Sequence, residues 1–124
     1  MVMSTTMPKR VYLAGPMTNR PYFNFQEFFR HAADLRLKGY TVCSPAEHDM
    51  ALAGDFYTKC PNGTNDELIA ATDKINYREC MKFDLNWIMD QADAIALMPD
   101  WETSSGARVE KGLADLLKLE VIYL

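Results

Sequence analysis

Glu110 is a carboxylate at a position where the sequence predicts a buried side chain. A helix starting near Gly106 places it on the same side as the residues Gly106, Val109, Leu113, Leu116 and Leu117. Asp84 is a second case, because the helix predicted from about Tyr77 to Asp90 includes it in the stripe of Tyr77, Met81, Leu85 and Ile88. A buried carboxylate must be paired or line a cleft. These two inward acids, on the helices flanking one predicted strand, favour acid–base or nucleophilic chemistry.

The residues just before Glu110 are suited to binding an anion. Ser104, Ser105 and Gly106 fit the start of a helix, where hydroxyls and free N–H groups can hold a phosphate. Arg20 would add a positive charge. The alternative is that the serines merely cap the helix and the acids are structural. No G-x-G-x-x-G or G-x-x-x-x-G-K-[ST] motif is present, which disfavours dinucleotide hydride transfer and NTP hydrolysis.

The elements that must position these residues alternate as in an α/β domain. Strands are predicted at Lys9–Ala14, Tyr40–Cys43, Asp93–Met98 and Glu120–Leu124. Helices are predicted from an N-cap at Asn24 to Gly39, from Tyr77 to Asp90, and from Gly106. The order predicts one domain over residues 1–124, a three-layer α/β fold of Rossmann-like or flavodoxin-like type with a parallel sheet of four to five strands.

Ligands of such sheets bind at the carboxyl ends of the strands. The loop after the first strand is therefore expected to bind substrate, through Gly15, Pro16, Met17 and Arg20, together with Asn24. Residues 47–76 show no clear pattern beyond a possible short helix at Asp66–Ala71. They are interpreted as an insert or a lid over the site.

Bulk composition narrows the class of protein. A net charge of −4 without a basic cluster argues against a nucleic-acid polymer as partner. No segment approaches the roughly 20 apolar residues of a membrane span. Three cysteines without a C-x-x-C pair favour free thiols in the cytoplasm. A zinc site drawn from Cys43, His48, Cys60 and Cys80 is an alternative, but the spacings match no zinc finger, and no metal is expected.

Four motifs of the sequence occur together: Tyr12-Leu13-Ala14-Gly15-Pro16, Asp84-Leu85, Asp93-Ala94, and Ser104-x-Gly106-x-x-x-Glu110 followed by Gly112 and Ala114. In combination they resemble the nucleoside 2-deoxyribosyltransferase-like superfamily, which includes 2′-deoxynucleoside 5′-monophosphate N-glycosidases. The resemblance implies that Glu110 is a nucleophile attacking the anomeric carbon. It implies that Asp84 handles the departing base or the sugar hydroxyl, and that Tyr12 orients Glu110. Transferases of the superfamily have Asp at the position of Ser104, whereas the monophosphate hydrolases have Ser.

The resulting expectation is an N-glycosidase acting on a (deoxy)nucleoside 5′-monophosphate through a covalent glutamyl-sugar intermediate. No metal or organic cofactor is needed for this reaction. Two alternatives stay open, base exchange by a nucleoside 2-deoxyribosyltransferase and a catalytically silent nucleotide-binding or sensing module. The resemblance also implies a homodimer or higher homo-oligomer.

Overall fold

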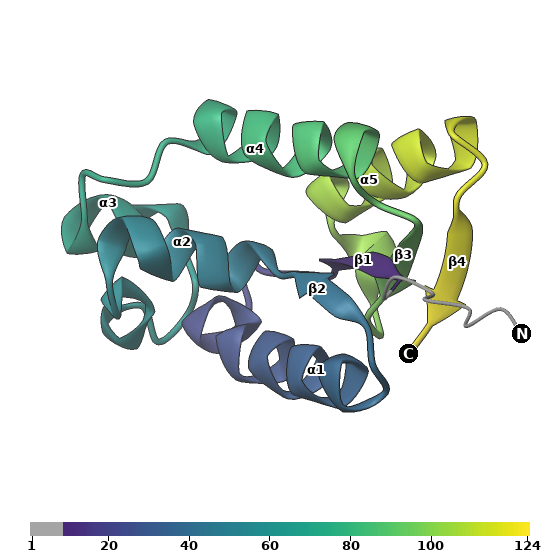
Figure 1. The fold of residues 1–124 in the computed structure, drawn as a ribbon. Helices are drawn as coiled ribbons and strands as arrows, with labels where there is room; N and C mark the ends of the chain where they lie inside the picture. The colour runs from purple at the N-terminus through teal and green to yellow at the C-terminus, as the bar shows by residue number, and fades with distance from the viewer. Residues whose placement is uncertain (1–8) are drawn as a thin grey trace, which may run out of the picture.

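The computed structural model describes residues 9–124 and has a parallel sheet at its centre (Figure 1). Its strands are β1 (Arg10–Ala14), β2 (Thr41–Cys43), β3 (Ala94–Leu97) and β4 (Glu120–Tyr123). They are ordered β2-β1-β3-β4, with every pair parallel. The predicted fold class is confirmed, as a three-layer α/β domain whose described residues contain four strands.

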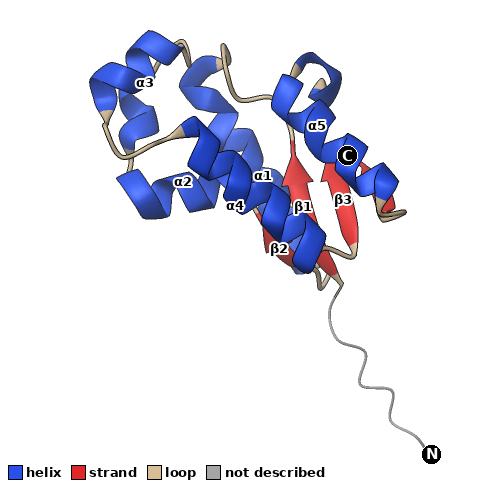
Figure 2. Ribbon diagram, turned by 90° about the horizontal axis from the view of Figure 1, so that it is seen from above, coloured by secondary structure: helices blue, strands red, loops and turns tan. Residues whose placement is uncertain are grey.

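Helices cover both faces of this sheet (Figures 1 and 2). One face carries α1 (Phe25–Leu37), and the other carries α4 (Tyr77–Asp90) and α5 (Ser105–Leu116). The bounds of α4 match the predicted ones. Helix α1 begins directly after the predicted N-cap Asn24 and ends before Gly39, and α5 begins one residue before Gly106. Within residues 9–124, no helix has both the length and the apolar character that a membrane crossing requires.

Alternation along the strands sorts their side chains between two apolar cores. In β1, Val11 and Leu13 pack on the α1 side, whereas Tyr12 and Ala14 pack on the side of α4 and α5. Ile95 and Leu97 of β3 share that second core. This register places the phenol of Tyr12 beneath α5, which is the helix that carries Glu110.

The loop after β1 reaches α1 through a strained turn. Tyr22, Phe23 and Asn24 have φ values of 53°, 55° and 62°, a region that non-glycine residues rarely adopt. Asn24 precedes α1 as predicted, but its side chain makes no capping bond. Its Nδ2 instead donates to the carbonyl of Pro16, 3.1 Å away, and so fixes the loop after β1.

Residues 45–76 form short helices and turns. They comprise α2 (Pro45–Ala53), a 3₁₀ turn η2 (Phe56–Lys59) and α3 (Asn65–Ala71), which confirms the predicted short helix to within one residue. A capping box between Thr64 and Glu67 starts α3. Phe56 is buried in the core beside α1 and packs edge-on against Phe25, with ring centroids 5.6 Å apart. The segment is therefore part of the folded body.

Two loops are joined by backbone hydrogen bonds. The N–H of Asn19 donates to the carbonyl of Gly63 at 2.8 Å, and the N–H of Tyr22 donates to that of Cys60 at 3.0 Å. At Gly63, where φ is +64°, a Cβ would lie 2.0 Å from the carbonyl oxygen of Arg20. Only glycine allows this approach. The contact ties the 45–76 segment to the loop after β1.

Candidate active site

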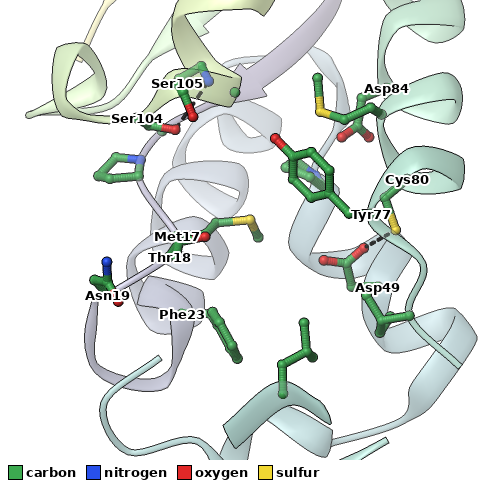
Figure 3. A pocket seen from close by; sticks show the side chains of 18 of the residues that line it. Met17, Thr18, Asn19, Phe23, Asp49, Tyr77, Cys80, Asp84, Ser104 and Ser105 are labelled. Carbon is green, nitrogen blue, oxygen red and sulfur yellow. Dashed lines mark hydrogen bonds between the residues drawn. The ribbon is translucent and has the colours of Figure 1, made fainter. Parts of the chain in front are cut away.

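A cavity of about 400 Å³ opens at the carboxyl ends of the strands. Its walls come from the loop after β1, the N-terminal turn of α5, one face of α4, and the 45–76 segment (Figure 3). Glu110 and Asp84 both line it. The two carboxylates predicted from the helical pattern therefore reach one cavity, from two different helices.

Glu110 is held by a tyrosine from the centre of the sheet. Its side chain is only 6% exposed, and Tyr12 is 0% exposed. The hydroxyl of Tyr12 donates to Oε2 of Glu110 over 2.7 Å. Because a donated O–H stabilises a carboxylate and limits its rotation, this bond prepares Glu110 as an oriented, ionisable oxygen facing the cavity.

Asp84, on the neighbouring helix α4, differs from Glu110 in its hydrogen bonding. It is also 6% exposed, yet its Oδ1 has no hydrogen-bond partner among the described residues. A buried carboxyl oxygen without a partner is costly, so it is available for a proton or a ligand group. Asp84 is therefore suited to exchange a proton with a molecule in the cavity.

The two acids titrate well above their usual range. Burial, and then the nearby charge of Asp84, raise the pKa of Glu110 to about 8. Burial, and then the charge of Asp49, raise the pKa of Asp84 to about 7. Buried neighbouring acids lose their protons in coupled steps, so near neutral pH the pair holds about one proton.

The single proton of the pair can reside on either acid. The higher pKa of Glu110 favours the form with the proton on Glu110, and the Tyr12 hydroxyl lowers the pKa of both acids. Attack by Glu110 would require the other form of the coupled pair, in which Glu110 is ionised and Asp84 holds the proton. The bond that Tyr12 donates to Glu110 stabilises that form, since a donor favours the charged carboxylate.

The start of α5 forms the rim of the cavity near these acids. Ser104 Oγ accepts a hydrogen bond from the N–H of Ala107 at 3.1 Å, so Ser104 is the N-cap. Ser104, Ser105 and Gly106 all line the cavity. The first N–H groups of a helix lack intrahelical partners and carry partial positive charge, which suits an anion.

The substrate-binding residues predicted in the loop after β1 separate into two groups. Gly15, Pro16 and Met17 line the cavity. Arg20 and Asn24 are not among the lining residues. Arg20 Nη2 donates to Thr103 Oγ1 at 3.1 Å, and its guanidinium lies 3.6 Å from Asp100. Asn24 thus holds the loop after β1 in place. Arg20 connects that loop to the loop before α5.

A comparison with protein-family models matches residues 9–123 to one described as a domain of unknown function, DUF4406. The chain belongs to the DUF4406 family. No curated protein and no solved structure matches it.

This DUF4406 domain also contains cavity residues that the sequence did not predict. Asp49 and Cys80 lie on one wall, and Tyr77 extends across the opening toward the start of α5 (Figure 3). The sequence places the segment Ser44–Asp49 at the carboxyl end of the second strand, but Asp49 was not named as a site residue because α2 was not predicted. Ser44-Pro45 was a usable signal, since Pro is favoured in the first turn of a helix and Ser before it.

The cavity of the DUF4406 domain has two contrasting sides. We call Glu110, Asp84 and the first turn of α5 the acidic wall. We call the opposite surface the apolar wall, which is formed by Phe23, Phe56, Leu68 and Ile75. A ligand that fills the cavity would meet ionisable groups and free N–H groups on one side and hydrocarbon on the other.

Proposed function

We propose that the protein is an N-glycosidase that hydrolyses the base–sugar bond of a (deoxy)nucleoside 5′-monophosphate. The observation that carries the proposal is the hydrogen bond from Tyr12 to Glu110 beside Asp84, at one cavity. An oriented carboxylate and a second carboxyl with a raised pKa are the two groups that a retaining glycosidase requires.

In the first step, Glu110 attacks the anomeric carbon. A bond forms between a Glu110 carboxylate oxygen and that carbon, and the C–N bond to the base breaks with its electron pair on nitrogen. Asp84 donates its proton to the departing base, so the base leaves neutral. The product of this step is a glutamyl-sugar ester with ionised Asp84.

In the second step, water resolves the ester. Asp84 accepts a proton from water as the oxygen attacks the anomeric carbon, and Glu110 leaves as a carboxylate. Both acids return to their starting states, and free sugar phosphate is released. The hydrogen bond from Tyr12 stabilises Glu110 as the leaving group here and as the nucleophile in the first step.

The other parts of the cavity support a nucleotide as substrate. The first turn of α5 offers N–H groups to a 5′-phosphate, and Ser104 adds no negative charge there. The apolar wall, with Phe23 and Phe56, is suited to the faces of an aromatic base. A volume of about 400 Å³ accommodates a small molecule of this kind.

We further propose that the protein acts as a cytoplasmic homodimer or higher homo-oligomer. The three cysteines are free, which suits a reducing compartment. On α5, Val109 and Leu116 are 53% and 77% exposed, so this helix presents apolar surface to a second subunit.

The deciding experiment incubates the protein with a panel of nucleoside and deoxynucleoside monophosphates and the matching nucleosides. Free base and sugar phosphate are then separated by chromatography. We expect both products from monophosphates, with no product from the Glu110→Gln variant. A new nucleoside in the presence of a second base would identify a transferase. Ligand-induced stabilisation without any product would identify a binding module.

A further inference from the structure

A second group of reactive side chains lies beside the catalytic pair and affects the proposed reaction only through the charge of Asp49, which helps to raise the pKa of Asp84. His48 and Asp49 come from α2, and Cys80 comes from α4. The His48 imidazole nitrogen, a carboxylate oxygen of Asp49 and the Cys80 sulfur all lie within 4.8 Å of one another. Figure 3 shows Asp49 and Cys80 facing each other across the wall of the cavity.

The distances within this group approach those of metal ligands. Cys80 Sγ lies 3.5 Å from Asp49 Oδ1, and His48 Nδ1 lies 3.8 Å from the same oxygen. Zinc bonds of about 2.0 Å to N or O and 2.3 Å to S place tetrahedral ligands about 3.3 to 3.5 Å apart. The two separations from Asp49 Oδ1 therefore differ from these values by at most about 0.5 Å. The separation between His48 and Cys80 would have to shorten by up to about 1.3 Å.

His48 presents an unpartnered ring nitrogen to the group. Its Nδ1 is buried and has no hydrogen-bond partner among the described residues. The ring stacks on Phe83 with centroids 3.7 Å apart and planes at 9°, which fixes the plane of the ring. A buried ring nitrogen without a partner is available to bind a metal ion.

We propose that His48, Asp49 and Cys80 form a binding site for a divalent zinc-type cation. One nitrogen, one oxygen and one sulfur ligand suit zinc better than Mg²⁺ or Ca²⁺, which prefer oxygen alone. Binding converts the Cys80 thiol to a thiolate and releases its proton to solvent. Because Asp49 and Cys80 line the cavity, a fourth coordination position would face into it.

The ion would connect two parts of the molecule. Two ligands belong to α2, within the 45–76 segment, and the third lies on α4 one turn before Asp84. Binding to the folded protein alone would raise its stability in proportion to the logarithm of the metal concentration. The glycosidase reaction proposed above does not use this ion, so the two proposals can fail separately.

The test titrates the full, untagged and metal-stripped chain with Co²⁺, and then displaces the cobalt with Zn²⁺. Cobalt reports its own ligands, because a bound thiolate gives a charge-transfer band in the near ultraviolet and a four-coordinate site gives strong visible bands. We expect one equivalent of Co²⁺ with both signatures, displacement by one equivalent of Zn²⁺, and a higher unfolding temperature with Zn²⁺.

Variants assign the ligands. Cys80→Ser should abolish the thiolate band, while Asp49→Asn and His48→Gln should each weaken Zn²⁺ binding at least tenfold. Cys43→Ser is the matched control, because Cys43 is another partly buried free thiol outside the group, and it should leave binding unchanged. The proposal is overturned if the folded wild-type chain shows no thiolate band, or if Cys43→Ser removes it. It is also overturned if the folded Asp49→Asn and His48→Gln variants bind Zn²⁺ as the wild type does.

Discussion

The acidic wall and the apolar wall of the cavity are built from different kinds of structure. Glu110 and Asp84 stand on α5 and α4, long helices packed on the sheet, and Tyr12 lies within its central strand. Phe56 and Leu68 come from a short 3₁₀ turn and a seven-residue helix in the 45–76 segment. Both walls are ordered, but regular hydrogen bonding holds the first, whereas loop contacts and aromatic packing hold the second.

The rigid wall carries the groups that are proposed to react, and the other wall sets the shape of the cavity. Groups that transfer protons or form bonds must be held to within a fraction of an ångström, which rigid elements provide. The shape of a binding surface can vary more freely, and short elements allow that variation. We therefore expect substitutions on the acidic wall to alter turnover with little loss of stability. Substitutions in the supports of the apolar wall should mainly alter stability.

Glu110→Gln gives the largest expected effect. The amide keeps the size of the side chain and can still accept the hydrogen bond from Tyr12, but it cannot attack the anomeric carbon. We expect turnover of the monophosphate to fall by at least about a thousandfold, with an unchanged circular dichroism spectrum. Glu120→Gln, at an exposed acid on β4, is the control. Near-normal turnover by folded Glu110→Gln would contradict the mechanism.

Asp84→Asn should reduce turnover about a hundredfold to a thousandfold and change its pH dependence. In the wild type, kcat/KM should rise as Glu110 ionises and fall as Asp84 loses its proton. The coupled pKa values of about 7 and about 8 put these limbs on either side of pH 7.5. The variant has no proton to lose at this position, so the falling limb should disappear. A profile of unchanged shape would make Asp84 a structural residue.

Gly63→Ala tests the support of the apolar wall. Its Cβ would meet the Arg20 carbonyl, so the contact between the two loops must open, at a cost of about 3 kcal/mol in the free energy of unfolding. Gly39→Ala, just after α1, is the control, because its φ of +95° also favours glycine but no atom lies within 4 Å of an added Cβ. It should cost about 1 kcal/mol. Equal losses in urea denaturation would show that the loop contact contributes nothing.

Ser104→Asp tests the anion site of the acidic wall. Asp still caps α5, but its charge repels a phosphate at the first turn. The KM for the monophosphate should rise about a hundredfold, while the unphosphorylated nucleoside should be little affected. A variant that harms both substrates equally would argue against phosphate at this position.

The smallest expected effect is a gain in stability for Glu110→Gln. The folded-state pKa of Glu110 is raised from 4.5 to about 8, so its favourable contribution is complete below pH 4.5 and is lost as the pH rises through 8. Glutamine does not ionise, so the variant does not lose this stability as the pH rises. Wild type and variant should therefore melt together at pH 4, and the variant should melt several degrees higher than the wild type at pH 9. A gain that is larger at pH 4 would reverse the predicted sign.

The sequence allowed the fold and the two acids to be predicted, although part of the reasoning about α5 was wrong. Val109 and Leu116 were expected to face inward with Glu110, but both are exposed. The buried stripe is Ala107, Glu110 and Ala114, at helical spacing. Small alanines pack close to the sheet, whereas a hydrophobicity pattern gives more weight to larger residues. The stripe predicted around Asp84 was also partly wrong. Tyr77 is exposed, whereas Asp84 and Ile88 are both buried.

The 45–76 segment could not be predicted to the same degree. Its α2 has little separation of apolar and polar faces, since only Pro45 and Ala46 are buried in it. Its position depends on contacts with distant residues, such as those of Phe56 with Phe25 and of Gly63 with Arg20. Such pairings leave no local pattern. The sequence named His48 and Cys80 among four candidate zinc ligands, but only the structure places these two beside Asp49 and leaves Cys43 and Cys60 out of the group.

The hydrogen bond between Tyr12 and Glu110 joins residues 98 positions apart in the chain. Closing so long a loop is slow and entropically costly, and the bond can form only when both β1 and α5 are in place. During synthesis, the early β1-α1-β2 unit would hold the tyrosine long before its carboxylate partner emerges. Folding intermediates would then lack the oriented Glu110, and the proposed activity would appear only when α5 docks.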